Sequence, residues 1–200
     1  MLNDEIELKT GDYINTVIYP YFLENFDKEK FYFSSVESYV YSKKNSNVLL
    51  KYEEKLPHIT KAVLNGKVDD TYNNFYQIIK NGMQSKQEMI IYRGICCDLK
   101  LNVGEIFDHK TFIWGSFHES YARKFMYDTS KCYDAKDFQR VDYSKKGVLL
   151  KIKVPIGIPY FERIVPIDFA PHEPKSEIIL LPSQLQVDKI EGDIIHLTVV

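Results

Sequence analysis

Several kinds of functional site have no support in this sequence, because the patterns that mark them are missing. The three cysteines are an odd set, with Cys96 and Cys97 adjacent and Cys132 apart. They have neither metal-ligand spacing nor a disulfide pattern, so we expect reduced structural thiols. There is no Walker loop, Rossmann glycine pattern or Cys/His motif. A nucleoside triphosphatase and a metal hydrolase therefore gain no support, and we expect no metal.

An excess of one charge and long apolar runs are missing too. The 26 basic and 28 acidic residues give a formal charge of -2, which provides no bulk attraction for nucleic acid. No apolar run approaches membrane-spanning length, and the N-terminus lacks the pattern of a signal peptide. We expect a cytoplasmic protein that binds no membrane, or one delivered into a host cell without a cleavable signal. Only four of the basic residues are arginines, so an arginine is the less expected choice at any basic position.

The sequence does contain enough apolar material for a core, since 44% of its 200 residues are hydrophobic and 14% aromatic. Without repeats, low-complexity tracts or a clear linker, we expect one domain over residues 1–200. Residues 1–85 have a helical pattern, in which Ser34-x-x-Glu37 resembles a capping box and Pro57 separates two short helices. A stripe at helical spacing predicts a core-facing helix and consists of Tyr72, Phe75, Tyr76 and Ile79.

Residues 86–200 are β-rich, because from Met89 onward the segments become short, β-branched and bounded by turns. The predicted strands are 89–95, 103–107, 111–114, 147–154, 160–165, 177–181, 184–190 and 194–200. One helix is predicted at about 117–127, with Ser116-x-x-Glu119 as its capping box. Polar residues 128–146 are expected to form an exposed loop. Helices followed by strands predict an α+β fold with a mainly antiparallel sheet.

Two of these strands carry a charge among apolar residues. Glu177 heads an apolar run that ends at Pro182, and alone it would be an exposed charge at a strand start. If it is buried it must meet a cation, donors or water. Arg93 interrupts the strand 89–95 and precedes Gly94, which lets a ligand approach the backbone. A guanidinium there suits a phosphate, and equally fits a carboxylate at the core edge. Because a sheet can bring both strands to one cleft, we favour a shared site.

Three short motifs follow one another along the chain. They are Tyr92-Arg93-Gly94, an aromatic-rich strand that ends in Ser116 before a helix with Ala122-x-x-Phe125, and Glu177-Ile178-Ile179-Leu180-Leu181-Pro182. In this order and spacing, the sequence resembles the arginine-serine-glutamate class of mono-ADP-ribosyltransferases, which includes bacterial exotoxins and phage enzymes. The segment 147–157 also looks like the strand and Pro-x-Gly turn that these proteins carry between the second and third motifs. The match spans about residues 89–200.

The resemblance implies a split β-sandwich that holds NAD in a central cleft, with the helical N-terminal part packed beside it. It implies that Arg93 contacts the NAD phosphates, that Gly94 offers backbone bonds to the nicotinamide amide, and that Ser116 braces the site. Glu177 would hydrogen-bond the 2′-OH of the nicotinamide ribose and stabilise an oxocarbenium-like transition state. Arg93, Ser116 and Glu177 are therefore the expected catalytic residues, and Phe125 is an expected NAD contact.

The chain departs from this family at two positions. Trp114-Gly115-Ser116 stands where the family has Ser-Thr-Ser or a near variant, so a serine that helps position the catalytic glutamate is missing. Trp114 is expected either to form a wall of the nicotinamide pocket or to be core. Lys175 replaces the family's Glu or Gln two residues before Glu177, which disfavours transfer to arginine because a charged lysine cannot accept a proton. The residues expected to recognise the acceptor are Phe169, His172, Glu173 and Lys175.

We therefore expect an NAD-dependent mono-ADP-ribosyltransferase with a macromolecular acceptor, most simply a protein. Lys175 keeps open an NAD glycohydrolase, in which water replaces the acceptor. Trp114 and Gly115 keep open a degenerate module that binds NAD without turnover. His118 and His172 are further candidates for a general base, but neither has a recognisable partner in the sequence, which favours surface or loop histidines.

Overall fold

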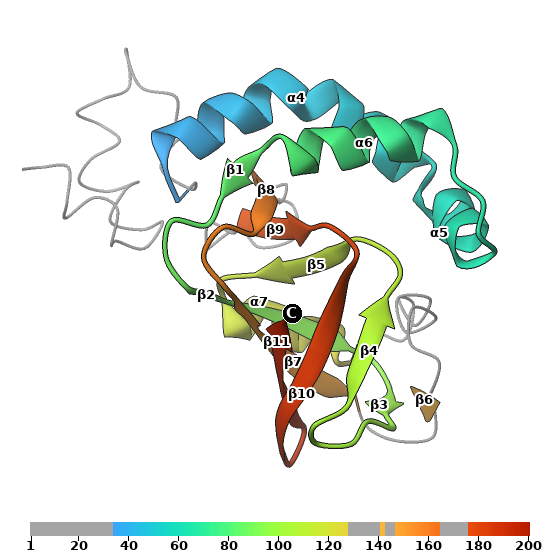
Figure 1. Ribbon diagram of the computed structural model, residues 1–200, viewed down its shortest axis with the longest axis vertical. Coiled ribbons are helices and arrows are strands. Elements are labelled where there is room, and N and C mark those ends of the chain that lie inside the picture. The colour runs from blue at the N-terminus through green and yellow to red at the C-terminus, as the bar shows by residue number, and fades with distance from the viewer. Residues whose placement is uncertain (1–33, 128–140, 143–146, 165–175) are drawn as a thin grey trace, which may run out of the picture.

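Helices occupy the first third of the described chain, up to Lys80, and strands dominate the rest. The computed structural model describes residues 34–127, 141–142, 147–164 and 176–200 (Figure 1). The helices are α4 (Val36–Glu54), α5 (Leu56–Leu64), α6 (Asp70–Lys80) and α7 (Glu119–Phe125). The strands are β1 (Met83–Gln84), β2 (Met89–Ile95), β3 (Asp98–Leu99), β4 (Ile106–His109), β5 (Ile113–Ser116), β6 (Val141–Asp142), β7 (Val148–Val154), β8 (Pro159–Ile164), β9 (Ser176–Leu180), β10 (Ser183–Glu191) and β11 (Ile194–Val199).

The predicted stripe on α6 is confirmed as the core-facing side of that helix. Tyr72, Phe75 and Ile79 are buried, and the ring of Phe75 packs edge-on against Phe112 and Phe161 from the sheet side. Such pairs add to the free energy gained by burying the rings. These aromatic residues therefore attach the helical part to the sheet.

Helix α4 begins one residue later than the predicted capping box implies. Ser35 is the N-cap residue, and its hydroxyl accepts a hydrogen bond from Ser38 N at 3.0 Å. Ser34 instead donates from its backbone N to Glu162 of β8 at 2.8 Å, and Ser38 Oγ donates to the same carboxylate at 2.7 Å. Glu162 is buried, so it needs these donors. They attach the start of α4 to β8.

Nine of the described strands form one sheet, in the order β1-β8-β9-β5-β2-β7-β11-β10-β4. Its described neighbours pair antiparallel apart from β7 with β11, which confirms the predicted mainly antiparallel α+β fold. Strand β2 pairs with β7 along its whole length. It meets β5 only where Tyr92 lies opposite Ser116. The sheet therefore divides into two halves between β2 and β5.

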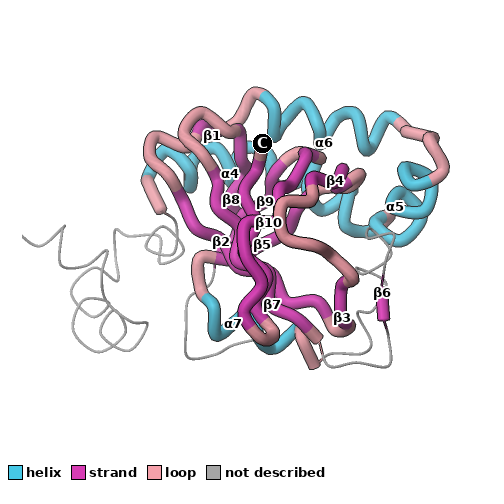
Figure 2. The backbone as a smooth tube through the Cα atoms, turned by 60° about the horizontal axis from the view of Figure 1, so that its bottom comes forward, coloured by secondary structure: helices cyan, strands magenta, loops and turns pink. Residues whose placement is uncertain are grey.

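Each half of the sheet packs one of its faces against the other half. Its opposite face is covered by helices. The core shared by the two halves includes Ile113, Ile178 and Leu180 from the first half and Leu150 and Leu197 from the second. Because side chains alternate along a strand, the opposite face of β5, β8 and β9 packs on the cluster under α4 and α6. Helix α7 covers β2 and β7. Figure 2 shows the strands between α7 and the layer of α4 to α6, as a split sandwich requires.

Three local predictions are wrong. Helix α7 has His118 as its N-cap residue, and Ser116 ends β5 instead of capping the helix. Strand β6, which pairs with β3, interrupts the segment predicted as a loop, and most of that segment lies outside the described residues, as do residues 1–33. The prediction of reduced thiols is wrong for Cys96, which is disulfide-bonded. Cys97 is a buried thiol.

The backbone of α7 packs so closely against Gly94 that a side chain there would clash. A Cβ atom at Gly94 would lie 2.0 Å from the backbone oxygen of Ala122, whereas one at Gly115 would lie 2.9 Å from Cδ1 of Ile91, the end of a side chain. We expect Gly94→Ala to lower the free energy of unfolding by about 2 kcal/mol or more, and Gly115→Ala by less. Urea unfolding of both variants measures this. Equal losses would mean that α7 does not press on Gly94.

Candidate active site

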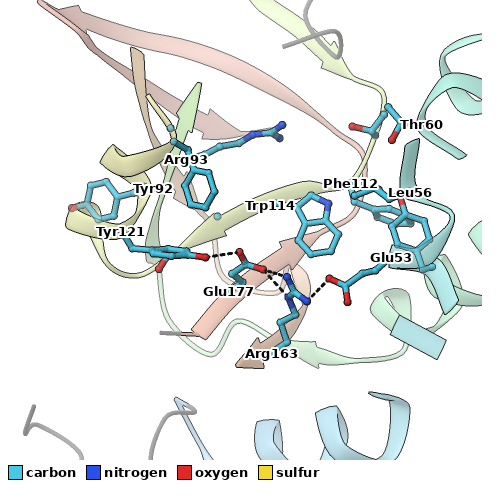
Figure 3. Close-up of a pocket in the computed structure, with 17 residues that line it drawn as sticks. Glu53, Leu56, Thr60, Tyr92, Arg93, Phe112, Trp114, Tyr121, Arg163 and Glu177 are labelled. Carbon is cyan, nitrogen blue, oxygen red and sulfur yellow. Dashed lines mark hydrogen bonds and ion pairs between the residues drawn. The ribbon is translucent and has the colours of Figure 1, made fainter. Parts of the chain in front are cut away.

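A pocket opens where the sheet divides between β2 and β5. Its walls come from these strands, from β8 and β9, and from helices α4, α5 and α7 (Figure 3). The charged residues that line it are Glu53, Arg93, Arg163 and Glu177, and the aromatic ones are Tyr52, Tyr92, Phe112, Trp114, Tyr121 and Phe125. Two of the four arginines in the chain therefore line one pocket, together with two carboxylates.

Backbone pairing places four of the lining residues in one row across the sheet. Tyr92 of β2 lies opposite Ser116 of β5, Ser116 lies opposite Glu177 of β9, and Glu177 lies opposite Arg163 of β8. Directly opposite residues share a face of a sheet and lie close enough for their side chains to interact. Ser116 is buried, and its hydroxyl accepts a hydrogen bond from His118 N at 3.1 Å at the turn into α7.

Glu177 forms an ion pair with Arg163, and Arg163 also binds Glu53 of α4. Oε2 of Glu177 accepts from Nε of Arg163 at 2.7 Å and lies 2.6 Å from its Nη2, while Nη1 donates to Oε1 of Glu53. Burial lowers the pKa of Arg163, but the charges of Glu177 and Glu53 outweigh burial and raise the pKa overall. The guanidinium therefore stays charged between two carboxylates.

The second oxygen of Glu177 faces Tyr121 of α7. The Tyr121 hydroxyl donates to Oε1 at 3.3 Å, a long hydrogen bond. Burial first, and then the negative charge of Glu177, raises the pKa of Tyr121 well above its ordinary value, so the hydroxyl keeps its proton. Phe125 packs edge-on against the Tyr121 ring, with centroids 5.1 Å apart. Because a 3.3 Å bond is weak, a stronger donor can displace Tyr121 from Oε1.

Arg93 is oriented by a buried histidine of β4. Nη1 of Arg93 lies 3.1 Å from Nε2 of His109, and Nδ1 of His109 lies 3.0 Å from the Thr111 carbonyl oxygen. A guanidinium can only donate and a carbonyl can only accept, so Nε2 accepts and Nδ1 carries the proton. Burial, followed by the charge of Arg93, lowers the pKa of His109 to about 3. The neutral imidazole therefore remains an acceptor for Arg93 at neutral pH.

The residues expected at the site gather in this pocket where the structure describes them. Arg93, Gly94, Trp114, Ser116, Phe125 and Glu177 all line it. Arg93 and Glu177 share the pocket, but the arginine that pairs with Glu177 is Arg163. Gly94 is open toward the pocket, although the side where its Cβ would lie is filled by α7. Phe169, His172, Glu173 and Lys175 lie outside the described residues.

Sequence reasoning missed Glu53, His109 and Arg163 as site residues. The scarcity of arginine was a signal for Arg163, but nothing in the sequence pairs it with Glu177. Trp114 lies half-buried against it, with the Arg163 guanidinium carbon 5.2 Å from the ring centre. This contact is a cation–π interaction, so the tryptophan supports the ion pair from the pocket side.

Comparison with known proteins adds an independent observation. No protein-family model matches the sequence, and no curated protein matches it. The solved structure of C3larvin toxin, an ADP-ribosyltransferase from Paenibacillus larvae, matches with 14% identity and a TM-score of 0.54, over 82% of this chain and 92% of that one. An ADP-ribosyltransferase from Clostridium botulinum matches with 13% identity and a TM-score of 0.54, over 88% of this chain and 96% of its own. The chain has the fold of ADP-ribosyltransferase toxins.

These matches confirm the fold that the resemblance of the three motifs implied. A second ADP-ribosyltransferase toxin from Paenibacillus larvae, Plx2a, matches with 10% identity and a TM-score of 0.53, over 82% of this chain and 91% of its own. In the described ranges no helix is long and apolar enough to cross a membrane. In the same ranges no three His, Cys, Asp or Glu side chains are grouped so as to hold a metal ion.

The buried His109 predicts a pH dependence of stability. Its pKa is depressed in the fold, so the unfolded chain takes up a proton near pH 6.5 that the folded chain does not. The contribution of His109 is therefore present above pH 6.5 and is lost as the pH falls toward 3. Relative to a His109→Gln variant, the wild type should lose about 1 kcal/mol of unfolding free energy between pH 6.5 and 5.5. Urea unfolding at each pH gives these free energies. If the wild type and His109→Gln lose the same free energy of unfolding as the pH falls, His109 is not a buried neutral histidine.

Proposed function

We propose that this chain is an NAD-dependent mono-ADP-ribosyltransferase that transfers ADP-ribose to a macromolecular acceptor, most simply a protein. One observation carries the proposal. Ser116, Glu177 and Arg93 come from distant parts of the sequence and line one pocket at the division of the sheet, within a fold shared with ADP-ribosyltransferase toxins. Arg93, Ser116 and Glu177 are the proposed catalytic residues.

The charges in the pocket suit both ends of NAD. Its diphosphate is anionic, and a guanidinium binds phosphate oxygens through paired N–H groups. Arg93 is buried and oriented by His109, so it can meet a phosphate with little loss of conformational freedom. The nicotinamide ring is cationic and flat, which suits the aromatic side chains near Glu177. Trp114, Tyr92 and Phe125 are the proposed contacts for that half of the dinucleotide.

Glu177 is the group that we expect to act on the scissile bond. When the nicotinamide–ribose bond breaks, nicotinamide leaves as a neutral molecule and positive charge develops on the ribose. A fixed carboxylate nearby stabilises that charge, as in glycoside hydrolysis. Because Arg163 binds Oε2 of Glu177, Oε1 is left to accept the 2′-OH of the ribose in place of the long bond from Tyr121. The acceptor nucleophile then forms a bond to C1′, which replaces the broken bond to nicotinamide, and its proton is released to solvent.

Transfer to water is the second candidate, and a sequence observation favours it. Lys175 stands two residues before Glu177, and a charged lysine cannot take a proton from the guanidinium of an arginine acceptor. In an NAD glycohydrolase, water would complete the reaction without a recognised acceptor. Phe169, His172, Glu173 and Lys175 remain proposed acceptor contacts. The assay with labelled NAD below separates the two candidates.

Replacing Glu177 by Gln should abolish turnover while leaving the fold and much of the NAD affinity. The lost interaction acts mainly in the transition state, so we expect kcat to fall by about 10²-fold or more. The assay incubates purified protein with labelled NAD, with and without cell lysate, and scores free nicotinamide and transferred label. Glu88→Gln is a matched control, because Glu88 forms an exposed ion pair with Lys153 and does not line the pocket.

Each outcome of this assay bears on the proposal. Label transferred by the wild type and by Glu88→Gln but not by Glu177→Gln supports the transferase. Release of nicotinamide without transfer in any lysate supports the glycohydrolase. Full activity of Glu177→Gln would remove Glu177 from the mechanism, and an inactive wild type that still binds NAD would identify a binding module.

Replacing Arg93 should mainly weaken the binding of NAD. A charge-assisted hydrogen bond to phosphate contributes about 1.5–3 kcal/mol, so Arg93→Ala should raise the Kd for NAD by about 10-fold or more. Arg93→Lys keeps the charge but loses the paired N–H groups, so its Kd for NAD should lie between those of the wild type and Arg93→Ala. Titration calorimetry gives these constants. An unchanged Kd in both variants would make Arg93 a structural residue.

A further inference from the structure

We infer that Arg163 is the positioning residue for Glu177, and that Glu53 of helix α4 acts on the reaction through Arg163. This inference rests on the proposed function. It adds two residues to the site and gives the helical part a role in catalysis, because Glu53 lies in the last turn of α4. Figure 3 shows the three side chains in a line, with Arg163 between the carboxylates of Glu53 and Glu177.

The geometry at Glu177 separates its two oxygens. Both the Nε and Nη2 atoms of Arg163 approach Oε2, at 2.7 and 2.6 Å, while Oε1 faces Tyr121 at 3.3 Å. A carboxylate held through one oxygen cannot rotate freely, so the direction of the other oxygen is fixed. Catalytic groups lose about 10²-fold in rate when they are misplaced by about 1 Å. Arg163 therefore controls where Oε1 meets the ribose.

Arg163 is itself held on three sides. Backbone pairing places it opposite Glu177, Trp114 covers its guanidinium, and Glu53 binds the Nη1 that Glu177 does not use. Its side chain is 18% exposed, against 14% for Glu177 and 26% for Glu53, so all three groups are largely withdrawn from water. In this environment an ion pair is stronger and less screened than at the surface.

Helix stability does not account for Glu53. A carboxylate in the last turn lies at the negative end of the helix dipole, where a cation is preferred. Burial, and then the neighbouring charge of Glu177, raises the pKa of Glu53 in spite of Arg163. At its other end α4 is attached to β8 through Glu162 and Ser38. Glu53 is therefore an unfavourable residue for α4 by itself, and its contact with Arg163 is the gain that the structure shows.

The test compares steady-state NAD cleavage by Arg163→Met, Glu53→Gln and the double variant. We expect Arg163→Met to lower kcat by about 10²-fold with KM for NAD changed less than about threefold, because the misplaced group acts in the transition state. Glu53→Gln should lower kcat by a smaller factor. The double variant should be no slower than Arg163→Met, because Glu53 acts only through Arg163. Arg123→Met, on a half-exposed ion pair with Glu119 outside the pocket, is the matched control.

If Arg163→Met does not fold, the conservative variant Arg163→Lys tests the positioning role. Arg163→Lys retains the charge but cannot reach both carboxylates with a planar fork, so it should unfold near the wild-type temperature and still lower kcat. A purely structural ion pair predicts the reverse, with lower unfolding temperatures and an unchanged kcat in the folded fraction. The double variant Glu53→Gln/Arg163→Lys decides the role of Glu53. If its kcat falls by the product of the two single losses, the residues act independently and the role of Glu53 is overturned.

The outcome also separates this inference from the proposed function. Wild-type kcat in Arg163→Met and Arg163→Lys, with turnover still dependent on Glu177, would overturn the positioning role and leave the transferase intact. An inactive wild type that fails to bind NAD would overturn both. Loss of NAD binding, rather than of kcat, in the Arg163 variants would reassign Arg163 to substrate binding.

Discussion

The arrangement of the site depends on a single backbone pairing, that of Tyr92 with Ser116. Apart from this pair, β2 pairs with β7, and β5 pairs with β9. The sheet therefore divides between β2 and β5. One side of the division carries Arg93 and the other carries Ser116 and Glu177. A continuous pairing of β2 with β5 would satisfy more backbone groups, but it would close the space that the pocket occupies.

Charge is the second constraint, because the pocket holds two guanidinium groups and two carboxylates with little exposure to water. A buried charge needs a partner, and the structure provides different partners for the two arginines. Arg93 contacts a neutral histidine, which accepts a hydrogen bond from its guanidinium and so orients it. Arg163 meets two carboxylates and is neutralised by them. In the proposed function Arg93 binds the anionic diphosphate, while Arg163 holds Glu177.

The features that could be predicted from the sequence are those set by local patterns. Strand β2, strand β7 and the stripe on α6 follow from the periodicity of their own residues, and Arg93 and Glu177 attract notice because each is a charge in an apolar strand. Each of these signals is contained in one short segment of the chain. The order of the three motifs then leads to the fold.

The remaining features depend on pairing that a single sequence does not encode locally. Arg163 faces Glu177 only because β8 and β9 pair in one register, and Glu53 reaches Arg163 from 110 residues away. The start of α4 was misplaced for a similar reason, since adjacent serines offer the same hydroxyl and Ser34 is taken by Glu162. Ser116 was expected to cap α7, but pairing with β9 keeps it in the sheet.

A crystal structure of the Glu177→Gln variant with NAD bound is the most direct test that this pocket is the active site. We expect the 2′-OH of the nicotinamide ribose to lie within hydrogen-bonding distance of the side chain at position 177. The diphosphate should lie against Arg93, with Arg163 still bridging position 177 and Glu53. NAD bound elsewhere, or with its nicotinamide ribose turned away from position 177, would contradict it.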